Sequence, residues 1–359
     1  MGEIKNEWIS QQTKVEILEV IDNAKAAGIS ITRTCTLLMI DRRRVTRWQM
    51  KMKNGDSIDN LKPGPREPVN RLLPVEREAV LAMAIREEYV DMSHRILAVT
   101  ACDLNIFFVS FSSVYRILRS ENLTTMRGKI REHNGRSIPP VRKTLSGPNQ
   151  RWCWDISYLP TMEKGVFLYL YLLLDEYSRK AISWLISWRQ TAEEARELLE
   201  EGLINENILD LPEDQRPEVF NDRGRQMKAK PIKIMFEENH MPQMFARPRT
   251  PNDNPYIESM FGTIKGSPQY PGGFLDRDEA VQYFMEYFNW YTYEHLHSGI
   301  DYVTPDQCHN GLRERIVSRR KQKIKKQLEY RKEVNRITQN VLTNYQENLM
   351  LINPLPVVV

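Results

Sequence analysis

The sequence of 359 residues lacks several features that would assign it to a narrow class. It has four cysteines, at positions 35, 102, 153 and 308, and their scattered spacing indicates reduced thiols in a cytosolic protein. The same spacing argues against a disulfide framework or a zinc site. No run approaches the roughly 18 apolar residues of a membrane span, and the first residues lack the apolar stretch of a signal peptide. We therefore expect a cytoplasmic protein without a membrane partner.

Net charge is also small, at +4, but it is unevenly distributed. Residues 1–150 carry 24 Lys and Arg against 17 Asp and Glu, residues 151–310 carry 16 against 26, and residues 311–359 carry 11 against 4. This layout suits a protein whose outer segments grip a polyanion while the middle performs chemistry with cations. Chance segregation of solvated charges is the alternative. The length permits two or three domains, each with its own core.

Residues 1–53 have the pattern of a helix-turn-helix domain. Helical apolar periods at 14–27 and 31–38 precede a short basic helix in which Val45 and Trp48 share one face. The last helix of such a unit enters the major groove of DNA. The arginines of this helix that would face outward are Arg42, Arg43, Arg44 and Arg47. A three-helix bundle with a solvated basic face is the alternative.

A second helix-turn-helix domain is predicted at residues 75–123, after a linker at 54–74 that is rich in Pro and Gly. A helix at 75–89 is followed by one that Ser93 caps, and a third helix carries Arg116 and Arg119 as candidate DNA contacts. Residues 124–150 then form a basic linker arm. Their composition indicates an extended segment along phosphates rather than a packed element.

Residues 151–311 change to alternating strands and helices. Strands are predicted at 151–160, 166–174 and 181–188, and Thr191 with Glu194 predicts a capped helix to about Ile208. Later strands at 218–220 and 242–246 alternate with helices, of which one begins at Pro255 and one follows Asp276 and ends near Glu294. This order is that of a ribonuclease-H-like α/β fold. The segment 312–359 is a basic tail, helical over 312–336, and residues 337–359 receive no assignment.

Three acidic residues have the positions that phosphodiester chemistry needs. Asp155 lies mid-strand between two apolar residues, where ionisation is costly unless a cation compensates. Asp222 closes the fourth strand, and Glu258 lies in the first turn of a helix. Mg²⁺ or Mn²⁺ takes oxygen ligands, and two such ions can activate the attacking oxygen and stabilise the leaving one. Singly, each acid is more often a cap or surface residue, and Glu258 alone could be favoured by the helix dipole.

Together the three acids belong to a wider resemblance. Residues from about Arg151 to Gln307 resemble the catalytic core shared by retroviral integrases and insertion-sequence transposases, with 35 residues between Asp222 and Glu258. The strings that carry this resemblance are Trp-Asp-Ile-Ser-Tyr (154–158), Leu-Asp-Glu-Tyr-Ser-Arg (174–179), Asn-Asp-Arg-Gly (221–224), the stretch 247–265, and His-Ser-Gly-Ile (297–300) with Thr-Pro (304–305). The strings 91–95 and 113–118 resemble the second helix-turn-helix of such transposases.

The resemblance implies that Asp155, Asp222 and Glu258 are the catalytic metal ligands. It implies that Lys265 approaches DNA ends, although an ordinary exposed lysine is the alternative, and that Asn254 orders the loop before the glutamate helix. Three positions depart from the family pattern, namely Ser157, Thr292 and His295, and they put the detailed role of the closing motif in doubt. The His-His-Cys-Cys zinc module of retroviral integrases is absent, which favours a bacterial transposase.

The sequence thus predicts a multidomain DNA transposase that nicks the ends of a mobile element and joins the freed 3′-hydroxyl to target DNA. The expected cofactor is Mg²⁺ or Mn²⁺, two per active site. Expected partners are DNA, as terminal repeats and target, and further copies of the chain, in a bacterial cytoplasm and on the nucleoid. The alternatives are a non-enzymatic DNA-binding regulator and a structure-specific nuclease on the same fold.

Overall fold

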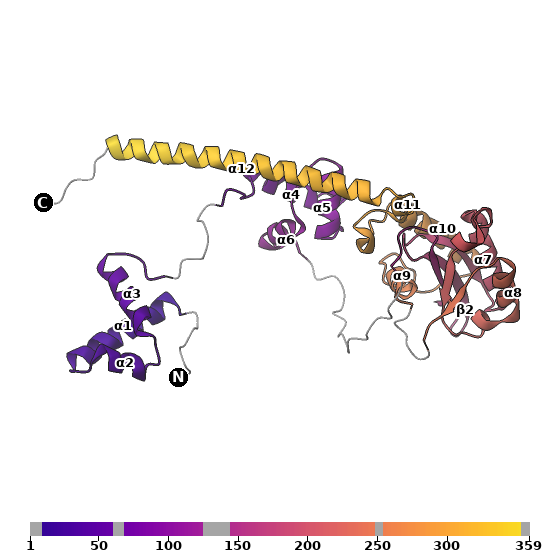
Figure 1. Cartoon of the computed structure of the whole chain (residues 1–359), viewed down its shortest axis with the longest axis horizontal. Coiled ribbons are helices and arrows are strands. Elements are labelled where there is room, and N and C mark those ends of the chain that lie inside the picture. Colours follow the sequence, from indigo (N-terminus) through magenta and orange to yellow (C-terminus); the bar gives the residue numbers. More distant parts are fainter. Residues whose placement is uncertain (1–8, 60–67, 125–143, 248–253, 353–359) are drawn as a thin grey trace. The chain divides into compact units, whose positions relative to one another are not determined.

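A computed structural model describes residues 9–59, 68–124, 144–247 and 254–352, with side chains described as far as residue 342 and at 344. Most of the predicted arm at 124–150 lies outside these residues. The chain divides into two compact units, residues 1–69 and 70–359 (Figure 1). Among the described helices, none combines the length and apolar character that a membrane crossing requires.

The first unit is built from three helices, α1 (Gln11–Ala26), α2 (Ile31–Leu37) and α3 (Arg42–Lys53). Asp41 caps α3 by accepting a hydrogen bond from the backbone N–H of Arg43 at 2.6 Å. Trp48 and Val45 are buried on its inner face, as the spacing predicted. The α1 and α2 helices confirm the two predicted helical segments to within a few residues.

Three further helices open the second unit: α4 (Pro74–Ala84), α5 (His94–Asp103) and α6 (Phe111–Ser120). Ser93 caps α5, as predicted, and Ser110 caps α6. The predicted helix to Tyr89 was too long, because α4 ends at Ala84 and turns follow it. The helices share one apolar core, which includes Val80, Leu97 and Val114.

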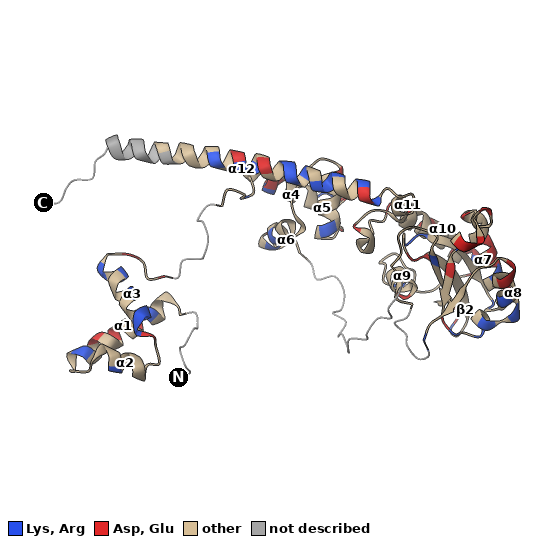
Figure 2. Cartoon of the chain, in the orientation of Figure 1, with Lys and Arg blue, Asp and Glu red and all other residues tan. Residues whose placement is uncertain are grey.

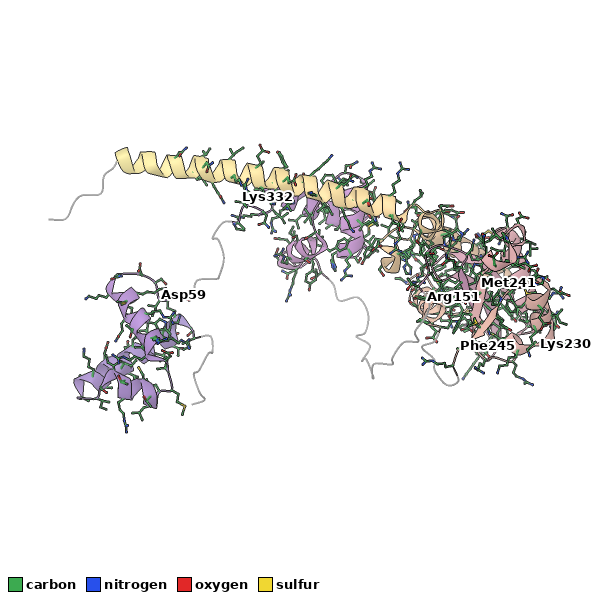
Figure 3. The ribbon with its side chains drawn as sticks, viewed as in Figure 1. Asp59, Arg151, Lys230, Met241, Phe245 and Lys332 are labelled. Atoms are coloured by element: carbon green, nitrogen blue, oxygen red, sulfur yellow. The ribbon has the colours of Figure 1, made fainter. Side chains whose placement is uncertain are left out.

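The α/β part holds a five-stranded sheet in the order β3-β2-β1-β4-β5. Its strands are β1 (Arg151–Pro160), β2 (Phe167–Asp175), β3 (Ala181–Ser187), β4 (Glu218–Asn221) and β5 (Gln243–Phe245). The first three form an antiparallel meander, and β4 and β5 run parallel to β1. Arg151, labelled in Figure 3, joins β1 to β4 through a hydrogen bond from Nε to Glu218 Oε1 of 2.6 Å.

Helices cover both faces of this sheet. The helices α7 (Ala192–Asn205) and α8 (Lys230–Glu238) pack with one face, which includes Trp152 and Trp154. The helices α9 (Pro255–Lys265) and α10 (Arg277–Tyr293) pack with the other, which includes Cys153. Single 3₁₀ turns lie at Ile208–Asp210, Glu213–Gln215, Gln226–Lys228 and Ser298–Ile300. The observed order confirms the predicted α/β core.

Two details of α7 correct the sequence prediction. Thr191 makes no capping bond to the helix backbone, because its hydroxyl donates to the carboxylate of Glu194 instead. The helix ends at Asn205 rather than near Ile208, since Asn207 adopts a left-handed conformation with φ of 50°. The chain then continues as a 3₁₀ turn.

The last two helices are α11 (Pro305–His309) and α12 (Arg313–Ile352), the latter 40 residues long. The predicted helix at 312–336 is confirmed but extends further, to Ile352. Between Arg320 and Asn335, α12 contacts the helices α4 and α5 and the segment just before α4 (Figure 1). This helix is therefore part of a packed structure over that length.

Candidate active site

The three acidic residues lie on elements that meet at β1. Asp155 is in the middle of β1 and, by strand alternation, points to the same face as the buried Cys153. Cys153 pairs with Phe220 of β4, so the same register continued by two residues brings Asp222 beside Asp155. Glu258 lies in the first turn of α9, which packs against β1. Sheet register and helix packing therefore direct the three residues to one region.

The protonation of Asp155 depends on its burial and on the two other carboxylates. Burial raises the pKa of Asp155 to about 7, and the charges of Asp222 and Glu258 raise it as well. A hydrogen bond from the N–H of Ile156 to Asp155 Oδ1, 2.8 Å long, opposes this shift by lowering the pKa. Burial also raises the pKa of Glu258. For Asp155, full ionisation at neutral pH is therefore costly without a compensating cation.

The donor chemistry of this region fits a hard divalent cation. All three side chains offer carboxylate oxygens, which Mg²⁺ and Mn²⁺ prefer. Asp222 is oriented by the N–H of Gly224, which donates to Asp222 Oδ1 at 2.8 Å. Within the described residues, no three acidic, histidine or cysteine side chains are gathered into a ready-made metal cluster.

Asn254, the residue before the glutamate helix, is buried at the N-cap of α9. Its side chain makes no capping hydrogen bond, and within the described part of the chain neither amide atom has a partner. Residues 248–253, immediately before it, lie outside the described residues. Lys265 is exposed in the last turn of α9, seven residues after Glu258, and so shares its side of the helix.

The arginines predicted to contact DNA differ in their surroundings. On α3, Arg44 is half-buried with its guanidinium carbon 5.5 Å from the centre of the Trp48 ring. The other candidates are exposed, namely Arg42, Arg43, Arg47, Arg116 and Arg119. Arg116 also donates to Ser113 Oγ at 3.0 Å on its own helix. These exposed side chains remain available for a partner, whereas Arg44 contributes to the core.

Ten of the eleven basic residues of α12 fall into two sets, and the eleventh, Lys332, is half-buried. Figure 2 shows their charges along the helix. One set binds the rest of the second unit: Arg313 pairs with Asp301, Arg320 with Asp103, Lys323 with the carbonyl of Cys102, and Arg331 with Glu76. The other set is exposed and comprises Arg315, Arg319, Lys321, Lys325, Lys326 and Arg336. From the sequence, all eleven basic residues were grouped as one tail. The exposed second set can face a polyanion, whereas the first set is bound to other parts of the protein.

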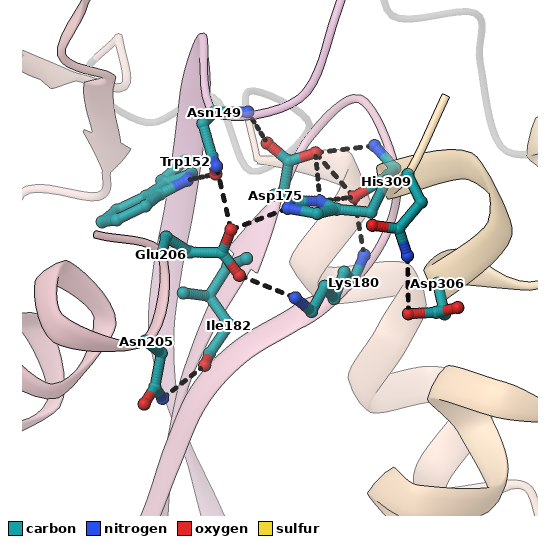
Figure 4. Close-up of polar contacts among 11 residues, drawn as sticks. Asn149, Trp152, Asp175, Lys180, Ile182, Asn205, Glu206, Asp306 and His309 are labelled. Carbon is teal, nitrogen blue, oxygen red and sulfur yellow. Dashed lines mark hydrogen bonds and ion pairs between the residues drawn. The ribbon is translucent and has the colours of Figure 1, made fainter. Parts of the chain in front are cut away.

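A buried polar network that the sequence did not reveal lies at the edge of the core (Figure 4). His309 of α11 interacts through Nε2 with Glu206 Oε2 at 2.7 Å and through Nδ1 with Ser178 Oγ at 2.9 Å. Lys180 donates to Glu206, and Asn149 joins Glu206 to Asp175. Burial would raise the pKa of Glu206, but the hydrogen bonds from His309, Asn149 and Lys180 lower it to about 2. The network fixes α11 to the turn after β2.

A second interaction that the sequence did not reveal lies beside the glutamate helix. The guanidinium carbon of Arg179 is 3.6 Å from the centre of the Tyr256 ring, two residues before Glu258. Arg179 belongs to the string at 174–179 that contributed to the family resemblance, so the signal was present in the sequence without a role attached to it. Its contact with Tyr256 joins residues that are far apart in the chain, which a single sequence cannot reveal.

Comparisons with known proteins agree with this architecture. Residues 146–251 and 240–305 each match a family model described as an integrase core domain. The transposase for insertion sequence element IS904 of Lactococcus lactis is 28% identical over 191 residues, which cover 50% of this chain and 71% of that protein. The transposase InsF for insertion sequence IS3A of Escherichia coli is 29% identical over 169 residues, covering 46% of this chain and 55% of that protein.

Two solved viral structures align with part of the chain. A simian T-cell lymphotropic virus intasome in complex with a PP2A regulatory subunit is 18% identical, with a TM-score of 0.37 over 60% of this chain and 74% of that chain. The HTLV-2 integrase catalytic core domain in complex with magnesium is 15% identical, with a TM-score of 0.34 over 45% of this chain and 97% of that chain.

The matched segments coincide with the five-stranded sheet and the helices on its two faces, so this part of the chain is similar to an integrase core domain. Over a similar length the chain is similar to transposases of insertion sequences. It spans a little over half the length of the Escherichia coli relative.

Proposed function

We propose that this protein is a DNA transposase that nicks the ends of a mobile element and joins the freed 3′-hydroxyl to target DNA. The observation that carries the proposal is the placement of Asp155 on β1, of Asp222 directly after β4 and of Glu258 on α9, which packs against β1, within residues similar to an integrase core domain. The proposed oxygen ligands for Mg²⁺ or Mn²⁺ are these three carboxylates. When bound, two such ions would lower the pKa of the attacking water or hydroxyl and neutralise the leaving oxygen.

The chain's own residues would contribute binding and orientation. Asp155, held by the N–H of Ile156, offers a carboxylate whose position the sheet fixes, and Asp222 is oriented by the turn at Gly224. Lys265 would contact a phosphate of the DNA end from the exposed side of α9. The two helix-turn-helix units would recognise the terminal repeats, and the exposed cations of α12 would add grip that is independent of sequence.

The proposal is tested with purified full-length protein and duplex DNA bearing candidate element ends. In Mg²⁺ or Mn²⁺ we expect nicked and then joined products, and in EDTA neither. Joining requires two ends to be handled together, so we also expect several copies of the chain in the active complex, measurable by mass photometry. Specific binding without any product would favour a DNA-binding regulator. Cleavage without joining, at branched DNA of any sequence, would favour a nuclease.

Base recognition by the two arginine-bearing helices is tested one residue at a time. Alanine at Arg43, Arg47, Arg116 or Arg119 should reduce the preference for end DNA over scrambled DNA at one or more of these positions. A good bidentate contact to guanine is worth roughly 1–3 kcal/mol, so the loss should be measurable at fixed salt. Arg44→Ala should instead lower stability, since Arg44 packs on Trp48.

The matched control for these substitutions is Arg33→Ala, which removes an exposed arginine of α2. It should leave the preference unchanged. Equal weakening of both DNAs at all four positions would mean that the helices hold phosphate only. End recognition would then have to come from the core or from the 124–150 arm.

The exposed cations of α12 are tested through the salt dependence of DNA binding. Replacing Lys321, Lys325 and Lys326 with Gln should reduce the slope of log affinity against log salt by about 0.9 for each phosphate that the variant no longer binds. The preference for end DNA should not change. Lys323→Gln is the control on the same helix, because Lys323 already donates to the carbonyl of Cys102 at 2.8 Å. An unchanged slope in the triple variant would show that this face of α12 does not lie on DNA.

Point substitutions are preferable here to removal of the whole basic tail. Deleting residues 312–359 would also remove Arg320 and Arg331, which bind Asp103 and Glu76 in the helices α5 and α4. A loss of DNA binding after such a deletion would therefore not distinguish a missing phosphate interaction from a disrupted fold.

A further inference from the structure

Within the described residues, the first turn of α9, which carries Glu258, has no side-chain cap at its start. Pro255 begins the helix, and the side chain of the N-cap residue Asn254 makes no capping hydrogen bond. The buried residues Ile257, Met260 and Ile264 fix the body of the helix against the core. Ile257 belongs to the first turn, so the core holds one side of that turn, and Tyr256 beside it makes a further contact.

That contact is the guanidinium of Arg179, which lies over the Tyr256 ring at 3.6 Å from its centre. A planar guanidinium over an aromatic face is favourable both electrostatically and by stacking. Arg179 comes from the turn between β2 and β3, whereas Tyr256 is on α9. The pair therefore connects the rigid sheet to the helix that carries Glu258.

Arg179 is held firmly enough to serve as an anchor. Its backbone is left-handed, with φ of 66°, a conformation that residues with a Cβ atom adopt only when the surroundings impose it. Its N–H donates to the carbonyl of Asp175 at 2.9 Å, and its guanidinium donates to the carbonyl of Glu176. Both carbonyls belong to residues that are almost fully buried. The turn thus presents the guanidinium in one fixed place.

The contact that the structure gives Arg179 on α9 is with the Tyr256 ring, two residues before Glu258. We therefore expect Arg179 to influence Glu258 through the position of the helix.

We propose that Arg179 is a positioning residue for catalysis, which stacks on Tyr256 and so fixes the first turn of α9 and the place of the Glu258 carboxylate. This inference rests on the proposed function, because it assumes that Glu258 is a metal ligand. Its consequence is that the shape of the Arg179 side chain is required in addition to its charge. Lysine keeps the charge but cannot stack as a plane.

The test compares Arg179→Lys and Tyr256→Leu with the control Tyr256→Phe, which keeps the ring. Hydrogen exchange in EDTA should be faster for the amides that bond back to the first turn of α9, from Glu258 on, in the two former variants and unchanged in the control. Mn²⁺ affinity, measured without DNA by electron paramagnetic resonance, should weaken about tenfold, and strand transfer should fall about ten- to a hundredfold. The Arg179→Lys and Tyr256→Leu double variant should be no worse than either single variant, because both remove the same interaction.

Other outcomes would overturn the inference. Unchanged exchange in α9 of Arg179→Lys would show that the stack does not hold the helix. A flatter salt dependence of DNA binding in Arg179→Lys, absent from Tyr256→Leu, would mean that Arg179 contacts a DNA phosphate instead. Failure of the proposed function is separately visible, as wild-type protein that neither binds Mn²⁺ nor cleaves end DNA. The exchange measurement would still decide whether Arg179 holds the first turn of α9.

Discussion

Asp155→Asn, Asp222→Asn and Glu258→Gln should each abolish cleavage and joining of end DNA while leaving its binding nearly intact. Each substitution keeps the shape of the side chain but removes the negative charge that a divalent cation requires. Metal assistance supplies several kcal/mol of transition-state stabilisation, so loss of a ligand should slow the reaction by about a thousandfold or more. The rate is measured as product formed from labelled end duplex in Mg²⁺.

The same three variants differ in their expected effect on the protein without metal. Asp155 is the most buried of the three and lies in the field of the other two carboxylates. Asp155→Asn should therefore raise stability in EDTA, because it removes a carboxylate that is costly to ionise. A matched control is Asp278→Asn, an exposed acid in the first turn of α10, which should affect neither stability nor rate. Near-normal strand transfer in any of the three variants would remove that residue from the proposed ligand set.

The sheet of this protein could be predicted closely because its strands carry strong local signals. Alternation of apolar and polar residues predicted β1 at Arg151–Pro160, where the structure has it, and the apolar runs predicted β2 and β3 to within one residue. The three acids remain a prediction from their spacing and from the motifs around them. Such signals depend on neighbours in sequence, and the strand register then brings them together.

What could not be predicted depends on contacts between distant parts of the chain. Arg179 contacts Tyr256 only because the fold brings the β2–β3 turn beside α9. In the same way, His309 contacts Glu206 only because the fold brings α11 beside it. The last part of α12, residues 337–352, was not predicted for a different reason. Residues 337–352 contain no Gly or Pro, so the helix continues to Ile352, yet they lack the clear apolar period on which helix prediction rests.

The clearest tertiary interaction that the sequence could not reveal is the ion pair between Glu76 on α4 and Arg331 on α12, which are 255 positions apart. Both side chains are less than a tenth exposed, and two hydrogen bonds of 2.7 Å join them. From sequence alone, a Glu and an Arg on amphipathic helices are expected on the surface. Here the pair joins α12 to α4.

Arg331→Met should release this attachment and should be the most destabilising substitution in the second unit. Glu76 would keep its charge in a buried place without its partner, and breaking a buried ion pair in this way costs about 3–5 kcal/mol. The opening free energy of α4 and α12 amides, measured by hydrogen exchange, should fall by about that amount. Arg319→Met, at an exposed position of the same helix, is the control and should have little effect.

The pH dependence of this loss separates the ion pair from simple packing. Burial would raise the pKa of Glu76, but hydrogen bonds from Arg331, the Leu73 N–H and Gln327 outweigh it and lower the pKa below its ordinary value of 4.5. A carboxylate with a lowered folded pKa contributes stability above its unfolded pKa, and that contribution is lost as the pH falls through the folded pKa. The difference in opening free energy between wild type and Arg331→Met should therefore be largest near neutral pH and should decrease in acid.

A double variant tests the same point. Adding Glu76→Gln to Arg331→Met should recover much of the lost opening free energy at neutral pH, because no buried charge is then left unpaired. A gap that is constant with pH, and no recovery in the double variant, would mean that Arg331 stabilises α12 by packing of its side chain rather than by its charge.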